Sequence, residues 1–402
     1  MQKKSYVCVG GYGLQYWGGI YKPDIAGNCN GLSICVLDHE TGKITLHSSL
    51  EGISNPGTLV VSPDKKYIYC ADEEHDFGGM GRGGGVTACS FDAATGTAKL
   101  INQSLAYGSS SCYVNIDKTG KYLLVANHGT KFYVTRFVEQ DGELQPVCVH
   151  DQGCVCLFAI REDGGVGKLL DRLVLDGTGA HPVEHASAHP HSVLIDDQDF
   201  IVIPNKGGDS ITVAKLNRET EKMDVLSVYK SDFGTSPRHA MFVPGTDFVL
   251  GTNEFGGQVT SYSLNRETGE LTRISLMQTY DQAYPSVSFM IVEKEKPWAI
   301  DVQLHPNGKF VYADNVQGLI LLYYLDRETG ELTHVRNVHV DDVPMLRGLQ
   351  ISPDGDYLIA TTVAGEKILV YRIDPETGFL TETSQLTLPT PTATRFVDVV
   401  EG

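Results

Sequence analysis

The sequence lacks any long apolar run. Nothing in its 402 residues approaches the roughly 20 consecutive apolar residues that span a bilayer. The apolar segment Tyr6–Val9 is far too short to be the core of a signal peptide. We therefore expect a cytoplasmic protein that does not bind membranes.

Positive charge is also scarce. The chain has 32 Lys and Arg against 50 Asp and Glu, a formal net charge of −18. Nucleic-acid binding needs a basic surface, so this balance argues against a nucleic-acid partner. If the ligand is an anion, positive side chains must be concentrated at one place.

The cysteines show no pattern of a metal site or a redox motif. The nine cysteines are odd in number and scattered, and none forms a CxxC pair. Most lie within apolar strand-like runs, such as Val7–Val9 and Tyr69–Ala71. Neither a redox motif nor a metal framework is expected, which agrees with a cytoplasmic location.

Amphipathic helical stretches are missing, and a repeated unit takes their place. Each unit has an apolar strand, a Pro-Asp-Gly type of turn, a second strand, a loop, a third strand, an (Asp/Asn)-x-Glu-Thr-Gly turn and a fourth strand. Pro353 follows Pro306 by 47 residues, close to the roughly 40–50 residues of a four-stranded propeller blade. A chain of this length exceeds one conventional core, and a repeat architecture accounts for it.

The units predict an all-β, seven-bladed β-propeller of four-stranded antiparallel blades, forming a single domain over residues 1–402. Six internal units have first strands that begin near Gly57, Cys112, His191, Arg238, Ile300 and Arg347. For the seventh blade, residues 5–11, 32–37 and 43–48 supply three strands and residues 393–400 supply the fourth. Pairing of the N- and C-terminal strands would close the ring and remove its exposed sheet edges.

Four segments interrupt the period, at residues 13–30, 77–85, 130–153 and 280–296. Long insertions in a compact repeat are often functional, so these segments are candidates for shaping a pocket.

Alignment of the units on their turns gives three columns of equivalent positions. The column at the start of the first strands reads Gly57, Cys112, His191, Arg238, Ile300, Arg347, and it varies too much for a purely structural role. The column at the end of the second strands reads Asp72, Asn127, Asn205, Asn253, Asn315, Thr362, which is typical of a residue that caps a turn. The next column reads Glu73, His128, Lys206, Glu254, Val316, Val363, and it varies again.

The two varied columns are expected to meet, because the start of one antiparallel strand lies beside the end of its neighbour. His191, Arg238, Glu254 and Arg347 would then converge at one mouth of the central channel. Such a group suits a small anionic ligand, since Arg binds carboxylate or phosphate in a bidentate manner. The alternative is that these residues form salt bridges between or within blades.

A histidine-rich segment precedes the fourth blade, with His181, His185 and His189 spaced as zinc ligands would be on a helix. Pro182 and Pro190 argue against that helix, so we expect a loop, no metal site and no cofactor. His189 arrives at the channel mouth, as does His239 beside Arg238, and both are candidate substrate contacts.

The ordered set of His191, Arg238, Glu254 and Arg347 resembles the seven-bladed lactonase family, whose namesake is the propeller-type bacterial 6-phosphogluconolactonase. The resemblance covers essentially the whole chain and is strongest over residues 188–254 and 298–378. Fungal carboxymuconate-lactonising enzymes look similar and share the fold. The family usually has His or Arg three residues before the proline of the sixth blade's turn, where this chain has Gln303, so we expect Gln303 to contact the substrate differently.

The resemblance implies a metal-independent lactonase acting on a small anionic sugar-acid lactone. Glu254 would act as general base toward water, and His191 would polarise the carbonyl or protonate the leaving alkoxide. Arg238 would stabilise the oxyanion, and Arg347 would bind the phosphate or carboxylate of the substrate. Two alternatives stay open: a cycloisomerase that closes a muconate-type lactone, and a non-catalytic interaction scaffold. The sequence does not determine the oligomeric state.

Overall fold

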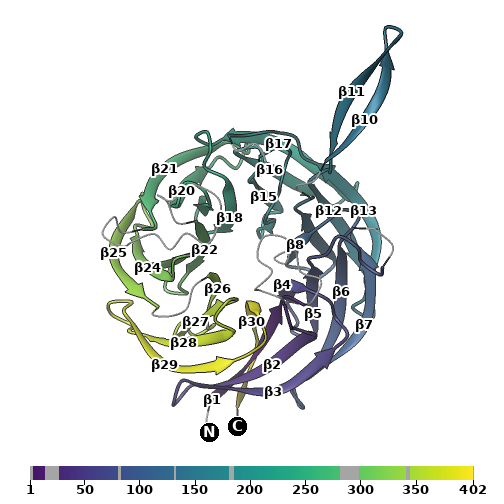
Figure 1. Cartoon of the computed structure of the whole chain (residues 1–402). Coiled ribbons are helices and arrows are strands. Elements are labelled where there is room, and N and C mark those ends of the chain that lie inside the picture. The colour runs from purple at the N-terminus through teal and green to yellow at the C-terminus, as the bar shows by residue number, and fades with distance from the viewer. Residues whose placement is uncertain are drawn as a thin grey trace.

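The computed structural model describes residues 3–13, 27–79, 83–130, 133–180, 185–280, 298–340 and 345–401. Within these ranges the strands form seven four-stranded antiparallel sheets and one two-stranded hairpin, and no helix is present. Figure 1 shows the seven sheets arranged as blades around a central axis. The predicted all-β, seven-bladed propeller is confirmed.

Six blades are continuous in the chain, and blade 1 combines three N-terminal strands with the last strand. Blade 1 has β1 (Lys3–Gly11), β2 (Gly31–Asp38), β3 (Lys43–Glu51) and β30 (Pro391–Glu401); blade 2 has β4 (Pro56–Val61), β5 (Tyr67–Asp72), β6 (Gly85–Asp92) and β7 (Thr97–Leu105); blade 3 has β8 (Ser111–Ile116), β9 (Tyr122–Asn127), β12 (Cys154–Ile160) and β13 (Val166–Val174). Blade 4 has β14 (Leu194–Ile195), β15 (Phe200–Asn205), β16 (Ser210–Asn217) and β17 (Lys222–Lys230); blade 5 has β18 (Pro237–Phe242), β19 (Phe248–Asn253), β20 (Gln258–Leu264) and β21 (Leu271–Gln278). Blade 6 has β22 (Ala299–Leu304), β23 (Phe310–Asn315), β24 (Leu319–Leu325) and β25 (Leu332–His339); blade 7 has β26 (Leu346–Ile351), β27 (Tyr357–Thr362), β28 (Lys367–Ile373) and β29 (Leu380–Thr387).

The core lies between blades rather than within any one of them. The middle strands are buried on both faces, and every residue of β15 and β23 is buried. One apolar cluster joins Phe200 and Val202 of blade 4 to Val249 and Tyr262 of blade 5. Outer strands such as β17 alternate between buried or half-buried and exposed residues, as expected for an antiparallel sheet with one solvated face. Each blade therefore completes the apolar core of the next.

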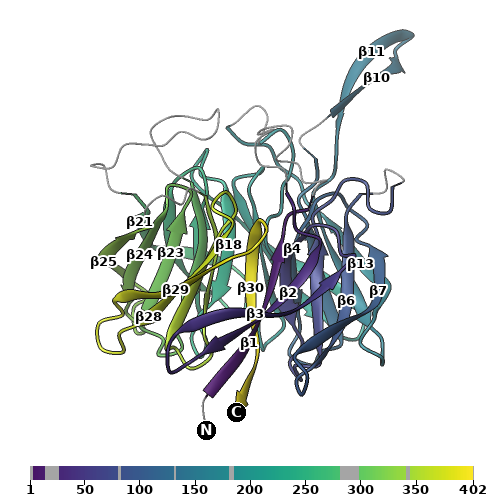
Figure 2. The same cartoon turned by 60° about the horizontal axis from the view of Figure 1, so that its bottom comes forward.

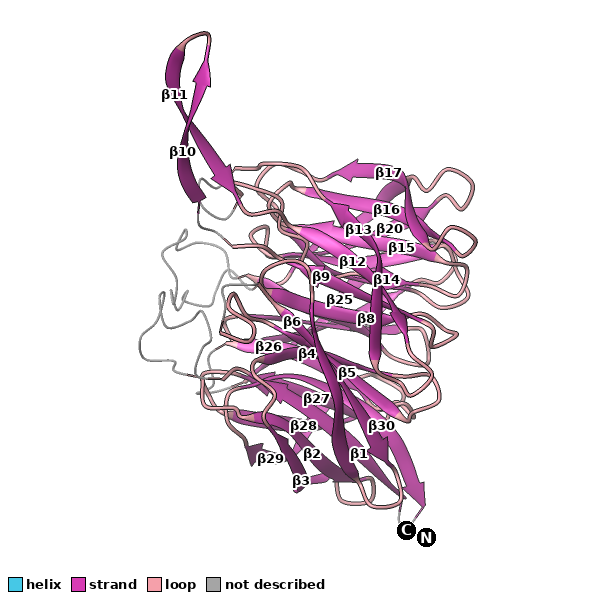
Figure 3. Ribbon diagram, turned by 90° about the vertical axis from the view of Figure 1, so that its right-hand side faces the viewer, coloured by secondary structure: helices cyan, strands magenta, loops and turns pink. Residues whose placement is uncertain are grey.

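The two ends of the chain close the ring within blade 1. β1 pairs with β2 on one side and with the C-terminal β30 on the other, and Val7 lies opposite Phe396. Figure 3 shows the two termini ending side by side. The predicted closure by terminal strands is therefore confirmed.

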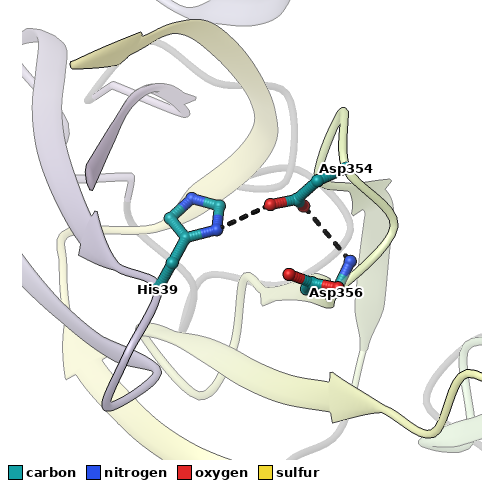
Figure 4. A group of neighbouring side chains, drawn as sticks. All are labelled: His39, Asp354 and Asp356. Carbon is teal, nitrogen blue, oxygen red and sulfur yellow. Dashed lines mark hydrogen bonds and ion pairs between the residues drawn. The ribbon is translucent and has the colours of Figure 1, made fainter. Parts of the chain in front are cut away.

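A group of polar side chains fastens blade 1 to blade 7 at the turn after β26. The Asp354 carboxylate forms an ion pair with Lys3, and it lies 2.8 Å from the Nδ1 of His39 (Figure 4). The other ring nitrogen of His39 lies 2.7 Å from the Ser5 hydroxyl. His39, Asp354 and Asp356 are the only group with metal-ligand spacing found in the described part of the chain. Asp354 contacts both Lys3 and His39, and these contacts join blade 7 to blade 1.

The inserted segment of blade 3 forms a hairpin of its own. β10 (Tyr133–Gln140) pairs only with β11 (Glu143–His150), and Figure 2 shows this hairpin projecting from the face opposite the two termini. Residues 14–26 and 281–297 of the two other long insertions, and residues 80–82 of the glycine-rich one, lie outside the described residues. The described residues include no helix long and apolar enough to cross a membrane.

Candidate functional site

The strand of each blade that lines the channel, which we call the inner strand, begins with a β-bulge. The bulge lies at the first-column position of the repeat. Between the pairs Pro237–Asn253 and Ala240–Gly251, β18 has one residue more than β19, which places Arg238 and His239 in the bulge. A bulge of this kind turns a side chain out of the regular ladder. The equivalent one-residue excess occurs at Gly57, Cys112, Ile300, Arg347 and Thr392, and blade 4 has it near His191.

Most of these inner strands follow a residue with left-handed backbone geometry. Asn55, Ser110, Ser236, Met345 and Thr390 have φ values of 47°, 53°, 55°, 73° and 36°. Such values are uncommon for residues other than glycine and are often found where a functional site imposes them. The chain turns sharply at these five positions and enters the channel wall at its bulge.

A backbone hydrogen bond ties the third column to the residue that precedes each inner strand. The Glu254 N–H donates to the Ser236 carbonyl at 2.8 Å, and the Lys206 N–H donates to the His189 carbonyl at 3.0 Å. The same bond is made by Glu73, His128, Val316 and Val363. The predicted meeting of the two varied columns is confirmed.

Blade 1 contributes two members that alignment of the repeats missed. The Tyr12 N–H donates to the Thr390 carbonyl at 3.1 Å, so Tyr12 occupies the third column and Thr392 the first. This blade is assembled from both ends of the chain, so its two inner strands are not joined by a turn on which to align it. The available signal was the Gly10-Gly11-Tyr12 end of an apolar strand.

The second column has the predicted structural role. The Asn315 side chain accepts bonds from the Gln317 and Leu319 N–H groups and donates to the Thr279 carbonyl. Asn205 similarly bonds the loop backbone on both sides. These amides hold the strand-to-loop turns on which the third column sits.

The bulge residues line a cavity in the channel. Its charged and titratable lining consists of Cys112, Tyr113, His191, Arg238, His239, Asp301, Arg347 and Arg395. Of the four residues expected to converge, His191, Arg238 and Arg347 line this cavity from three blades, and His239 lines it as well, whereas Glu254 is not part of the lining.

Glu254 lies behind this lining and forms two ion pairs. Its carboxylate is 2.9 Å from the Lys206 Nζ and 2.9 Å from the Arg238 Nε, and all three side chains are at most 5% exposed. Burial alone would raise the pKa of Glu254, but Lys206 and Arg238 lower it to about 2. Part of the alternative interpretation is thus correct, because Arg238 and Glu254 do pair within blade 5.

Arg238 is held on several sides. Besides Glu254, its Nη1 donates to the Ile300 carbonyl at 2.7 Å and to the His239 Nε2 at 3.1 Å. Burial and the neighbouring Arg347 lower the pKa of Arg238. The guanidinium is therefore a fixed positive group, with its orientation set before any ligand arrives.

His239 is oriented in turn by a carboxylate. Its Nδ1–H donates to the Asp301 Oδ1 at 2.9 Å, which leaves Nε2 as an acceptor. Burial and then Arg238 lower the pKa of His239 to about 4, so the ring is neutral near pH 7. Asp314 lies beside Asp301 and accepts its N–H, and burial together with the charge of Asp301 raises the pKa of Asp314 to about 8.

His191 is neutral for a similar reason. Burial and then the charges of Arg238 and Lys206 hold its pKa well below 6.5. The ring lies 5.4 Å from that of His239, and its Nδ1 is buried without a hydrogen-bond partner among the described residues. A neutral imidazole with an open ring nitrogen can accept a proton.

Arg347 is positioned from blades 1 and 2. Its Nε donates to the Tyr12 hydroxyl at 3.1 Å, and that hydroxyl donates to the Glu73 carboxylate at 3.0 Å. Glu73 lies 3.9 Å from the Arg347 Nη2, so the carboxylate acts on the guanidinium both directly and through Tyr12. Tyr12 and Glu73, both in the third column, thus orient the side chain of Arg347 in the first column.

Two expected substrate contacts lie outside the cavity lining. His189 is fully buried, stacks on His128 at 4.4 Å, and its Nδ1 lies 2.7 Å from the His128 carbonyl. Gln303 lies two residues beyond Asp301 on β22 and donates to its Oδ2 at 3.3 Å. Of the other histidines in the cluster, His185 lies 3.7 Å from Asp209, and His181 is outside the described residues.

Sequence reasoning did not select Lys206, Asp301 or Arg395. Lys206 lies in the varied third column, so the sequence did mark it as a possible site residue. Asp301 follows Ile300 of the first column, and nothing in the sequence marked it. Arg395 lies on β30, in the blade that could not be aligned. Arg238, Arg347 and Arg395 line the cavity together with one carboxylate, Asp301, in a chain whose net charge is −18, and Lys206 lies behind the lining, paired with Glu254. The positive charge is therefore concentrated locally, as an anionic ligand requires.

The fold and this cavity define a class: a closed seven-bladed propeller whose channel is lined by ionisable side chains. A family model described as lactonase, 7-bladed β-propeller matches residues 15–396. The chain belongs to this family.

Named relatives agree with the assignment at modest identity. The chain is 26% identical over 367 residues to a 6-phosphogluconolactonase of Formosa agariphila, covering 88% of this chain and 92% of that one. It is 22% identical over 379 residues to a 6-phosphogluconolactonase of Bacillus subtilis, covering 93% and 96%. A periplasmic gluconolactonase of Pseudomonas aeruginosa has the same fold, with a TM-score of 0.81, 22% identity and 99% and 100% coverage.

Proposed function

We propose that the protein hydrolyses the cyclic ester of a sugar acid that carries an anionic group, as a 6-phosphogluconolactonase would. The observation that carries the proposal is the set of His191, Arg238 and Arg347, placed by three blades in one cavity with more cations than ionised acids around it. The reaction requires no metal or cofactor in this proposal, because side chains supply both charge and base.

Arg347 is proposed to bind the anionic group of the substrate. It lines the cavity, its side chain is 16% exposed, and Tyr12 and Glu73 fix its direction. Arg395 lines the same cavity and adds a second guanidinium. Guanidinium groups suit this task because their planar fork matches phosphate and carboxylate oxygens.

Arg238 is proposed to stabilise the oxyanion that forms when water attacks the lactone carbonyl. Glu254, His239 and the Ile300 carbonyl hold the guanidinium in place, so little reorganisation is needed as negative charge develops. Preorganised charge of this kind is commonly the largest contribution to catalysis of acyl transfer.

His191 is proposed as the general base, in place of the role that the sequence suggested for Glu254. The Glu254 carboxylate is paired with Lys206 and Arg238 and is not part of the cavity lining. His191 lines the cavity, is neutral, and has a buried Nδ1 with no hydrogen-bond partner among the described residues. The proton that His191 removes from water can then pass to the alkoxide oxygen when the ring C–O bond breaks.

The test compares hydrolysis of 6-phosphogluconolactone and unphosphorylated gluconolactone, with spontaneous opening subtracted. Loss of a charged contact to phosphate costs about 1.5–3 kcal/mol, so Arg347→Ala should raise KM for the phosphorylated lactone by about 10- to 100-fold. KM for the unphosphorylated lactone should change much less. Arg336→Ala, an exposed arginine on β25 outside the cavity, is the matched control.

The proposal fails if wild-type protein opens neither lactone above the spontaneous rate. The assignment of Arg347 alone fails if its variant affects both substrates equally. A muconate-type lactone assayed for ring closure and opening separates hydrolysis from cycloisomerisation.

A further inference from the structure

The hairpin formed by β10 and β11, which we call the arm, is built unlike the rest of the molecule. Every residue of β10 is exposed, and so are seven of the eight residues of β11. The arm nevertheless carries seven of the fifteen exposed large hydrophobic residues in the described part of the chain: Tyr133, Val134, Phe137, Val138, Leu144, Val147 and Val149. Figures 1 and 2 show it standing clear of the blades.

Apolar side chains lie on both faces of the arm. Cross-strand pairing places Phe137 opposite Pro146 on one face and Val134 opposite Val149 on the other. These side chains have exposed fractions of 37–68%, and they are divided between the faces, with Tyr133, Phe137 and Leu144 on one and the four valines on the other. An exposed apolar patch of a few hundred Å² on a monomer often marks an interaction site.

A two-stranded sheet in water is also marginal on its own. Independent stability generally needs three or more strands with a covered apolar face. Two arms joined edge to edge would make a four-stranded sheet, in which the apolar side chains of the two copies become neighbours on each face. We propose that the arm is a dimerisation element and that its partner is the arm of a second copy of this chain.

The strand edges favour pairing through β10. β11 contains Pro146, which has no N–H to donate, whereas β10 contains no proline. Antiparallel pairing of β10 with its copy about a two-fold axis brings Phe137, near the middle of the strand, close to its symmetry mate. The interface is then isologous and closed.

Charge explains why contact occurs at the arm and argues against other occupants. Each copy has a net charge of −18, yet an eight-residue strand is about 27 Å long, beyond the roughly 8–10 Å over which salt screens charge. The arms can therefore meet while the acidic propellers stay apart. The arm itself has Arg136 as its one described cation against Glu139, Asp141 and Glu143, which disfavours an anionic membrane or nucleic acid.

Sedimentation velocity of the purified full-length protein tests this proposal. We expect a dimer at about 10 μM and a shape elongated along the arms. Phe137→Asp places two like charges beside the two-fold axis, and it should raise the dimer dissociation constant at least about 100-fold, as for a central interface residue. Phe233→Asp is the matched control, because Phe233 is 80% exposed but lies outside the arm.

A second variant replaces residues 133–150 with a short Gly-Ser link and should be monomeric, with the same thermal unfolding as the wild type. A wild-type protein that is monomeric at 100 μM would overturn the proposal, whether or not the arm then binds another protein. So would a dimer that survives both arm variants. The outcome does not depend on lactone hydrolysis, since no arm residue lines the cavity.

Discussion

Replacement of Glu254 by Gln should destabilise the protein in a way that depends strongly on pH. The carboxylate lies between Lys206 and Arg238 with almost no exposure, and its pKa falls from 4.5 to about 2. That shift corresponds to about 3 kcal/mol in favour of the ionised form in the folded state. Removing one partner of a buried ion pair typically costs about 3–5 kcal/mol, because the remaining charges stay buried.

The sign of the pH dependence follows from the lowered pKa. Stabilisation by Glu254 is complete above about pH 4.5, and it declines as pH falls toward about 2, where the folded protein takes up the proton. The difference in unfolding free energy between wild type and Glu254→Gln should therefore be about 3 kcal/mol at pH 7 and shrink steadily below pH 4.5.

Urea unfolding followed by circular dichroism at pH 7, 4.5 and 3.5 measures this difference. Glu270→Gln, at an exposed position of blade 5, is the control and should change stability by less than about 0.5 kcal/mol. Equal stability of wild type and Glu254→Gln at pH 7, or a difference that does not vary between pH 3.5 and 7, would refute the electrostatic account of this site.

Three further predictions concern the other ionisable groups. If His191 is the base, the rate of lactone hydrolysis should fall as pH drops through a pKa below 6.5 and should be flat from about pH 6.5 to 7.5. A His191→Gln variant with the rate and the pH profile of the wild type would contradict the assignment. In the folded protein Asp314 keeps its proton up to about pH 8, whereas in the unfolded chain it releases the proton near pH 3.8, so the stability of the wild type falls as pH rises between these values. The free energy of unfolding of Asp314→Asn relative to that of the wild type, measured with denaturant, should therefore be higher at pH 8 than at pH 5. The same difference at both pH values would contradict the raised pKa. Tyr12→Phe removes the acceptor that orients Arg347, and steady-state kinetics should show KM for the phosphorylated lactone rising about 10-fold with little change in kcat, whereas an unchanged KM would exclude the positioning role.

The repeat was predictable because its turns impose specific residues. Pro-Asp-Gly turns recur at a blade-length spacing, so the strand order and the ring closure could be derived from spacing alone. The same alignment located Arg238 and Arg347, since equivalent positions in a repeat vary only where structure does not constrain them.

What the sequence could not supply was the pairing of charges. Asp301 orients His239 from the next blade, and Lys206 reaches Glu254 across a blade boundary. Such contacts depend on side-chain direction at a bulge, which strand periodicity does not encode. The weak basicity of Glu254 is likewise a result of its two buried partners and could be recognised only with the geometry known.

The bulges have a consequence for how such a protein can change its substrate. At each of the seven inner strands, one extra residue stands outside the ladder at the channel wall, so the regular pairing of the strands does not dictate its side chain. Glycine, cysteine and threonine already occupy this position at Gly57, Cys112 and Thr392. The ring thus presents one such position per blade around a common centre, and the third-column residue that supports each position has to change together with it where the two are paired, as Arg238 and Glu254 are.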